Sequence, residues 1–154
     1  MTPKTTLSVV AAALLIGAGM SAAAVSMAAP PAPPAQDEVV ALVNKVRTGA
    51  GCAPLIVDGR LTKAATEHSA DMARRGYFSH TTPEGVTFGE RVRAAGYPAP
   101  GAENIARGHA SADEVVDGWL KSRGHRKNIM NCSLRTIGVG VEHDGNYWTQ
   151  DFGR

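Results

Sequence analysis

Apolar side chains recur every three or four residues in four segments of the chain, which is the spacing of one face of an α-helix. In the second of these segments the face carries Leu61, Ala64, His68 and Met72. The four segments are 37–51, 59–77, 88–98 and 111–122. The pattern therefore predicts four helices.

Residues typical of helix ends bound these segments. Asp58 and Ser111 stand at N-cap positions, and Glu114 follows Ser111 after three residues, the spacing of a capping box. Gly76 and Gly96 can end the second and third helices, because glycine adopts the left-handed conformation that helix ends often need. The segment 123–132 is expected to add one or two further helical turns.

Strict alternation replaces the helical period near the C-terminus. Ile137, Val139 and Val141 alternate with smaller or polar residues, and the pair Asp144-Gly145 follows as a hairpin signal. This pattern predicts two antiparallel strands within 135–152. Residues 101–108 are also strand-like, and 53–60 is expected to be an extended link. Helices that come mostly first and a hairpin that comes last indicate an α+β fold, with helices packed on a small sheet.

Two glycines, Gly138 and Gly140, lie on the same face of the first predicted strand. A strand face without side chains lets another part of the molecule, or a ligand, approach the backbone closely. Close packing of a helix is the favoured interpretation, and approach of a ligand is the alternative.

The N-terminus has the features of a secretory signal peptide. Lys4 precedes the apolar run 7–20, which is shorter than the ~20 residues of a membrane span. Small residues suit cleavage after Ala28, and no cysteine of a lipoprotein signal follows the run. We predict a signal peptide at 1–28, a Pro-rich linker at 29–36 and one domain at 37–154, secreted and without a transmembrane span after cleavage. A retained N-terminal anchor is the alternative.

Charge and cysteine content narrow the classes of partner. The chain carries a formal net charge of +2 and has neither a basic run nor an aromatic-rich stripe, which argues against nucleic acid. Cys52 and Cys132 are its two cysteines. An even number in an exported protein predicts a disulfide, worth about 4–5 kcal/mol by the chain-entropy model for a loop of this length. Two buried free thiols are the alternative.

The five histidines fall into two groups. His68 lies on the apolar face of the second helix and is expected in the core, whereas His109 and His143 are expected at the surface. His80 and His125 each lie in a polar segment, where a core role is not the default. Two imidazoles with a carboxylate are the minimum for a divalent metal site or for acid/base chemistry. The sequence lacks a G-x-S-x-G elbow and a P-loop, so covalent catalysis has no support.

Five segments, taken together, resemble one protein family. They are "ALVNKVR", "LIVDGRLTKAATEHSADMARRGYFSHTTPEG", "AENIA", "VVDGWLKSRGHRKNIMN" and "IGVGV…YWTQDFG". In order and spacing they are similar to bacterial members of the CAP superfamily, which comprises cysteine-rich secretory proteins, antigen 5 and pathogenesis-related proteins and is also called the SCP domain. The resemblance runs from Val39 to Gly153. It implies a three-layer α-β-α sandwich with a small antiparallel central sheet.

The resemblance also implies an open cleft lined by two histidines and acidic residues. Carried over by motif, "FSH" places His80 in the cleft, "AENIA" places Glu103 there, and "GHR" places His125 there. Ser122 occupies the place of a second acidic residue, and Ala102 replaces the usual glycine. In some members the two histidines bind a divalent cation, often zinc. Glu103 would either join them as a ligand or accept an N–H from a histidine, and we favour the second role.

Three functions follow from this site. The favoured one is a binding module for a lipid, a cell-wall fragment or a peptide, with or without a divalent metal. A metal-assisted extracellular hydrolase is the first alternative, in which His80, Glu103 and His125 would be the catalytic candidates. A stable extracellular scaffold, whose polar cluster only holds loops together, is the second. The sequence implies no other cofactor and leaves the oligomeric state open.

Overall fold

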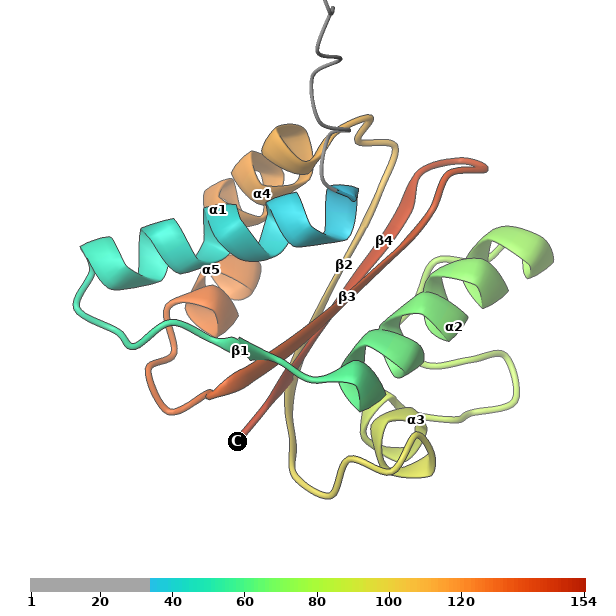
Figure 1. Ribbon diagram of the computed structural model, residues 1–154. Coiled ribbons are helices and arrows are strands. Elements are labelled where there is room, and N and C mark those ends of the chain that lie inside the picture. The colour runs from blue at the N-terminus through green and yellow to red at the C-terminus, as the bar shows by residue number, and fades with distance from the viewer. Residues whose placement is uncertain (1–33) are drawn as a thin grey trace, which may run out of the picture. The chain divides into compact units, whose positions relative to one another are not determined.

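A computed structural model describes residues 34–154 of the chain (Figure 1). The predicted signal peptide and all but the last residues of the predicted linker lie outside the described residues. The elements are α1 (Ala35–Gly49), β1 (Ile56–Val57), α2 (Gly59–Arg75), α3 (Phe88–Ala94), β2 (Pro100–Arg107), α4 (Ala112–Lys121), α5 (Arg123–Ile129), β3 (Thr136–Glu142) and β4 (Tyr147–Gly153).

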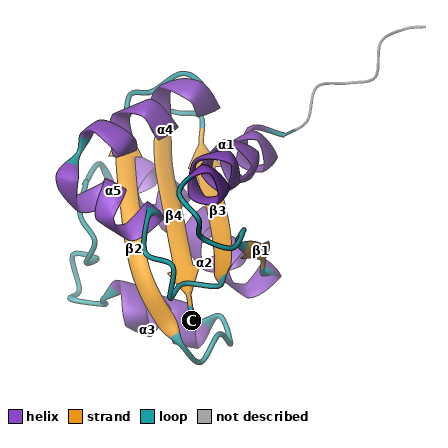
Figure 2. Ribbon diagram, turned by 90° about the vertical axis from the view of Figure 1, so that its left-hand side faces the viewer, coloured by secondary structure: helices purple, strands orange, loops and turns teal. Residues whose placement is uncertain are grey.

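The elements form the predicted α-β-α sandwich. The sheet has the strand order β1-β3-β4-β2. Strands β2, β4 and β3 pair antiparallel, whereas the two-residue β1, expected as an extended link, pairs parallel with β3. Figure 2 looks onto the sheet from the face covered by α1, α4 and α5, with α2 and α3 behind it. Among residues 34–154, no helix has the length and apolar character needed to cross a membrane.

Helix boundaries follow the capping chemistry of the sequence. Asp58 accepts a hydrogen bond from the backbone N–H of Arg60, and Gly76 ends α2 at φ +69°. Ser111 caps α4 by accepting from the N–H of Glu114. Helix α1 begins at Ala35, two residues before the apolar pattern, because Pro34 supplies a free carbonyl to its first turn.

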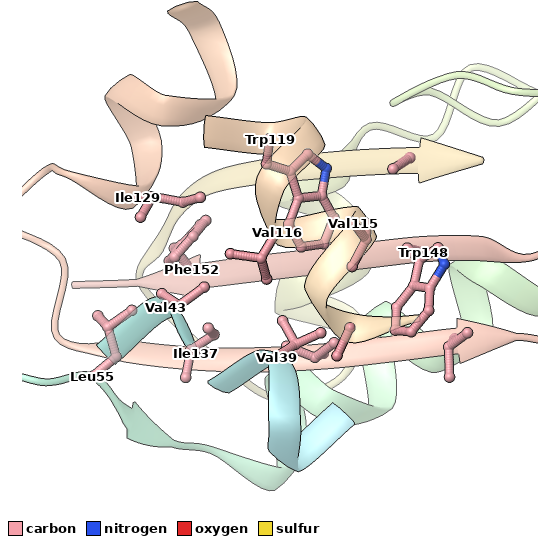
Figure 3. Close-up of a cluster of buried hydrophobic side chains, with 14 of the residues drawn as sticks. Val39, Val43, Leu55, Val115, Val116, Trp119, Ile129, Ile137, Trp148 and Phe152 are labelled. Atoms are coloured by element: carbon pink, nitrogen blue, oxygen red, sulfur yellow. The ribbon is translucent and has the colours of Figure 1, made fainter. Parts of the chain in front are cut away.

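The larger core lies between the sheet and the layer of α1, α4 and α5 (Figure 3). Trp119 and Trp148 are its largest members, and both are almost fully buried. Each indole N–H donates to a backbone carbonyl, Trp119 to Ile105 and Trp148 to His109, at 3.2 and 2.9 Å. The buried rings therefore leave no polar atom unsatisfied.

Helix α2 packs directly on the other face of β3. A Cβ atom on Gly138 or Gly140 would overlap backbone atoms of α2, at Leu61 and Thr62 or at Ala65 and Thr66. Ile137, Val139 and Val141 point the opposite way, into the larger core. The glycines thus serve close helix packing, as favoured from the sequence, and no space for a ligand separates helix and strand there.

The disulfide between Cys52 and Cys132 is present, which confirms the pairing over the free thiols. Beside it lies Arg47, which is fully buried and which the sequence pattern did not single out. Its guanidinium donates five hydrogen bonds of 2.7–3.2 Å to backbone carbonyls of Ala53, Ile129, Asn131 and Leu134. Arg47 and the disulfide therefore tie the end of α1 to the segment between α5 and β3.

Candidate functional site

Three sequence-predicted residues come from three different elements. His80 lies on the loop between α2 and α3, Glu103 lies on β2, and His125 lies on α5. The fold brings α3, β2 and α5 together at one part of the sheet, because α3 and α5 both pack against β2. The site is therefore built across the topology rather than within one local motif.

Glu103 is the centre of this arrangement. Its side chain is 2% exposed, and each carboxylate oxygen has a partner. Oε1 accepts from Nδ1 of His80 at 2.7 Å, and Oε2 accepts from Nη2 of Arg91 at 2.6 Å. Burial raises the pKa of Glu103, but the hydrogen bond from His80 and the charge of Arg91 outweigh it, so the pKa falls below its ordinary value. Glu103 is thus an ionised, buried carboxylate.

Arg91, on α3, was missed by the sequence reasoning. Besides Glu103, its guanidinium donates from Nη1 to the backbone carbonyls of His80 and Val86, at 2.8 and 3.3 Å. One side chain therefore fixes both the carboxylate and the loop that carries His80. In the sequence Arg91 is simply a cation near the end of a short helix, where it suits the helix dipole. No local signal distinguishes it.

The loop before His80 is anchored to α2. His68 is buried, as predicted, and its Nε2 lies 2.9 Å from the carbonyl oxygen of Ser79. Tyr77 donates to Asp71 at 2.8 Å. Burial, followed by the charge of Arg91, lowers the pKa of His68, so this imidazole is neutral and donates its Nε2–H to Ser79. His68 thereby holds the backbone next to His80.

His125 is half-buried on α5, the helix that packs against β2. Burial lowers the pKa of His125, and the charge of His80 acts in the same direction. The carbonyl of His125 accepts from Asn104 at 3.3 Å, and Asn128 donates to Oδ1 of Asn104 at 2.9 Å. These asparagines, both inside the quoted motifs, dock α5 onto β2.

A second carboxylate lies behind Glu103. Asp151 on β4 is directly across from Glu103 in the β2–β4 register and is 1% exposed. Burial raises the pKa of Asp151 well above its ordinary value, and the negative charge of Glu103 adds to the effect. Asp151 is therefore a neutral acid in the sheet, and its Oδ1 has no hydrogen-bond partner within residues 34–154. The sequence reasoning did not single it out.

The remaining candidates are Ser122, His143 and His109. Ser122 is half-buried at the junction of α4 and α5, three residues before His125, and its hydroxyl makes no capping hydrogen bond. His143 is exposed in the β3–β4 turn, as predicted. His109, expected at the surface, is half-buried. The prediction was wrong because its ring packs against the bare Cα of Gly118 on α4.

Whether these residues could hold a metal ion depends on which of their donor atoms are not already hydrogen-bonded. Within the described part of the chain, no three His, Cys, Asp or Glu side chains lie together as a complete metal-holding group. Glu103 has both oxygens engaged, and Nδ1 of His80 faces it. Nε2 of His80 and the imidazole of His125 are left as the donors that a divalent cation could use.

Known proteins carry the same domain. The family model of the cysteine-rich secretory protein family, CAP, matches residues 40–152. The uncharacterized protein YkwD of Bacillus subtilis (strain 168) is 40% identical over 119 residues, which are 76% of this chain and 46% of YkwD. The uncharacterized membrane protein YlbC of the same organism is 35% identical over 118 residues, 76% of this chain and 34% of YlbC.

A solved structure agrees with the sequence relatives. An extracellular protein of Bacillus anthracis that contains an SCP domain superposes with a TM-score of 0.74 at 32% identity, over 82% of this chain and 45% of that one. The chain spans less than half the length of each of these three proteins. Together with the family model, they confirm the resemblance seen in the sequence. The chain belongs to the CAP family of cysteine-rich secretory proteins.

Proposed function

We propose that this CAP domain is an exported binding module, in which His80 and His125 hold a divalent cation, zinc in the first place. Through that cation the cleft would take a small oxygen-bearing ligand from a lipid, a cell-wall fragment or a peptide. Export is supported by the leader pattern of residues 1–28, by the disulfide and by the extracellular relative.

The observation that carries the proposal is the hydrogen bond between Nδ1 of His80 and Glu103. A histidine whose one nitrogen donates to a carboxylate has a fixed tautomer, and its other nitrogen becomes a more basic donor for a metal. The His80 side chain is 53% exposed, so this second nitrogen is accessible. The lowered pKa of His125 keeps a lone pair available on the second ring.

The residues present fit part of a zinc site. Two imidazoles supply half of a tetrahedral set, which leaves positions for oxygen from water or from a ligand. When bound, the cation would supply a Lewis acid that attracts such oxygens. Glu103 would orient His80, and Arg91 would keep Glu103 ionised and in place.

The hydrogen bonds of Glu103 and the neutral form of Asp151 favour binding over hydrolysis. A hydrolase of this kind needs a carboxylate that can accept a proton from water. Both oxygens of Glu103 are already engaged, and Asp151 is buried and neutral. Ser122 adds no charge where a second acid would stand. Binding is thus the chemistry that this donor set serves best.

The first experiment is a zinc titration by calorimetry on untagged protein. Wild type should bind one zinc per chain, whereas His80→Ala and His125→Ala should each weaken binding by about tenfold or more. His143→Ala is the matched control, since this exposed histidine lies on the hairpin turn, and it should bind as wild type does. Absence of metal-dependent heat in wild type, or an equal loss in the control, would overturn the proposal.

A second measurement separates binding from a scaffold role. The melting temperature of metal-free His125→Ala should lie close to that of wild type, because the half-buried ring makes no hydrogen bond within residues 34–154. A large drop would support the scaffold instead. Pull-downs with lipid and cell-wall material, with zinc and with chelator, would then test the ligand, and retention that ignores the chelator would contradict the role of the metal.

A further inference from the structure

A depression of the surface lies between the end of α4 and the outward side of α5, with a volume of about 480 Å³. Its lining includes none of His80, Glu103 and His125. Its lining combines four cations with two half-buried apolar side chains and contains no carboxylate. The lining residues are Leu120, Lys121, Arg123, Arg126, Lys127 and Met130.

Most of this charge is not neutralised by the protein. Lys121 pairs with Asp117 at 2.6 Å, and both side chains are exposed. The side chains of Arg123, Arg126 and Lys127 have neither an ion pair nor a hydrogen bond within residues 34–154. Three unpaired cations within five residues are a concentrated charge in a chain whose net charge is only +2.

Helix stability does not account for all three cations. Arg126 and Lys127 lie in the last turn of α5, where the helix dipole favours positive charge. Arg123 is the first residue of α5, where the dipole disfavours it. Asn128 on α5 donates to β2, whereas Arg123, Arg126 and Lys127 are exposed, so the helix presents its cations on the solvent side.

The geometry points to a linear polymer bearing phosphate groups as the partner of this pocket, bound through Arg123, Arg126 and Lys127. Arginine presents a planar fork of donors that matches phosphate oxygens, and lysine adds a mobile point charge. Several cations in one depression suit a chain of phosphates better than a single anion.

Two other anionic partners fit less well. Leu120 and Met130 line the pocket but are half-buried, so they do not project into a bilayer as membrane-binding side chains do. The lining has no aromatic side chain, and binding of single-stranded nucleic acid relies on stacking with such rings. The lining therefore suits a ligand that is recognised through its phosphate groups alone, and not through bases or acyl chains.

The test uses the whole mature protein and a short linear inorganic polyphosphate as the probe. For three phosphate contacts, the logarithm of the binding constant should fall with the logarithm of salt with a slope of roughly −2. The triple variant Arg123→Gln/Arg126→Gln/Lys127→Gln should bind about tenfold more weakly at low salt and show a nearly flat slope. Should the triple variant fail to fold, Arg126→Gln and Lys127→Gln, taken singly, should each lose part of the affinity.

The control variant removes three exposed cations from other parts of the molecule, Lys45→Gln/Arg93→Gln/Arg135→Gln. It changes the net charge by the same amount as the pocket variant does. Polyphosphate binding should therefore stay within about twofold of wild type if the pocket is specific. An equal loss in both variants would overturn the proposal in favour of general attraction. The zinc titration should be unchanged in the pocket variant, so failure here and failure of the proposed metal site are separate results.

Three further outcomes would overturn the proposal. The first is no binding of polyphosphate by wild type at low salt. The second is binding to anionic phosphatidylglycerol vesicles without binding to polyphosphate, which would indicate a membrane partner. The third is clearly tighter binding of a single-stranded oligonucleotide than of a polyphosphate with the same number of charges, which would indicate recognition of bases.

Discussion

The contact between α2 and β3 predicts that the substitution Gly138→Ala is strongly destabilising. A Cβ at this position would overlap the backbone nitrogen of Thr62 and the carbonyl carbon of Leu61, and would lie 2.6 Å from Cβ of Leu61. Backbone atoms cannot rotate away as a side chain can. The helix would have to move off the strand, and α2 also carries His68, which holds the loop before His80.

The size of the effect follows from overpacking. Extra methyl groups in packed regions cost typically about 1–3 kcal/mol, and a clash with backbone belongs at the upper end, so we expect a loss of about 3 kcal/mol. For a domain of this size that corresponds to a fall of roughly 12 °C in melting temperature. Urea unfolding followed by circular dichroism measures it. Gly59→Ala, at the start of the same helix with open space around it, should change stability by less than about 1 kcal/mol.

A Gly138→Ala variant with the same melting temperature as wild type would contradict this prediction. Loss of ligand or zinc binding at unchanged stability would mean that the glycine is kept for the approach of a ligand, the alternative that the sequence left open. A loss of stability in Gly59→Ala as large as that in Gly138→Ala would show that the helix responds to any added methyl group rather than to the clash.

Three further predictions concern Glu103, Arg47 and His68. Glu103→Gln should weaken zinc binding by about 10–100-fold in calorimetry, because the His80 tautomer loses its carboxylate, and unchanged affinity would contradict this. Arg47→Met should lower the free energy of unfolding in urea by about 3–5 kcal/mol, since four backbone carbonyls lose their donor and two of them, those of Ile129 and Leu134, are in buried hydrogen bonds; an unaltered midpoint would count against it. The folded-state pKa of His68 lies below 6.5, so the unfolded chain takes up the proton first, and stability should fall as pH drops below 6.5. His68→Gln should flatten that decline in urea unfolding, and an equally steep decline would argue against the assignment.

The fold could be predicted from the sequence because its signals are local. Caps such as Asp58 and Ser111 act within one helical turn, and the alternation around Ile137 acts within one strand. Because these signals are local, they do not predict every side-chain contact. Glu114 was expected to complete a capping box with Ser111, but its carboxylate accepts from the N–H of Ala110 instead.

The site could be predicted only in part, because its members meet through the sheet register and not through spacing in the chain. His80, Glu103 and His125 were identified by motifs. Arg91 is twelve residues before Glu103, and its role depends on α3 packing against β2. Asp151 faces Glu103 only because β2 and β4 pair in one particular register. Nothing in the sequence around Asp151 indicates that it lies opposite Glu103.

Under the proposed function, the charges around Glu103 also limit which ligands the site would bind. Arg91 balances the single ionised carboxylate, Asp151 is neutral, and Ser122 brings no charge where a second acid would stand. As ligands of a cation both imidazoles would be neutral, so the residues of the site would carry no net charge of their own. Under the proposed function, a divalent cation on His80 and His125 would therefore add two positive charges that nothing in the cleft offsets. A ligand that carries a negative charge is favoured in such a site, so carboxylate- or phosphate-bearing fragments are the ones to expect among lipids, cell-wall pieces and peptides.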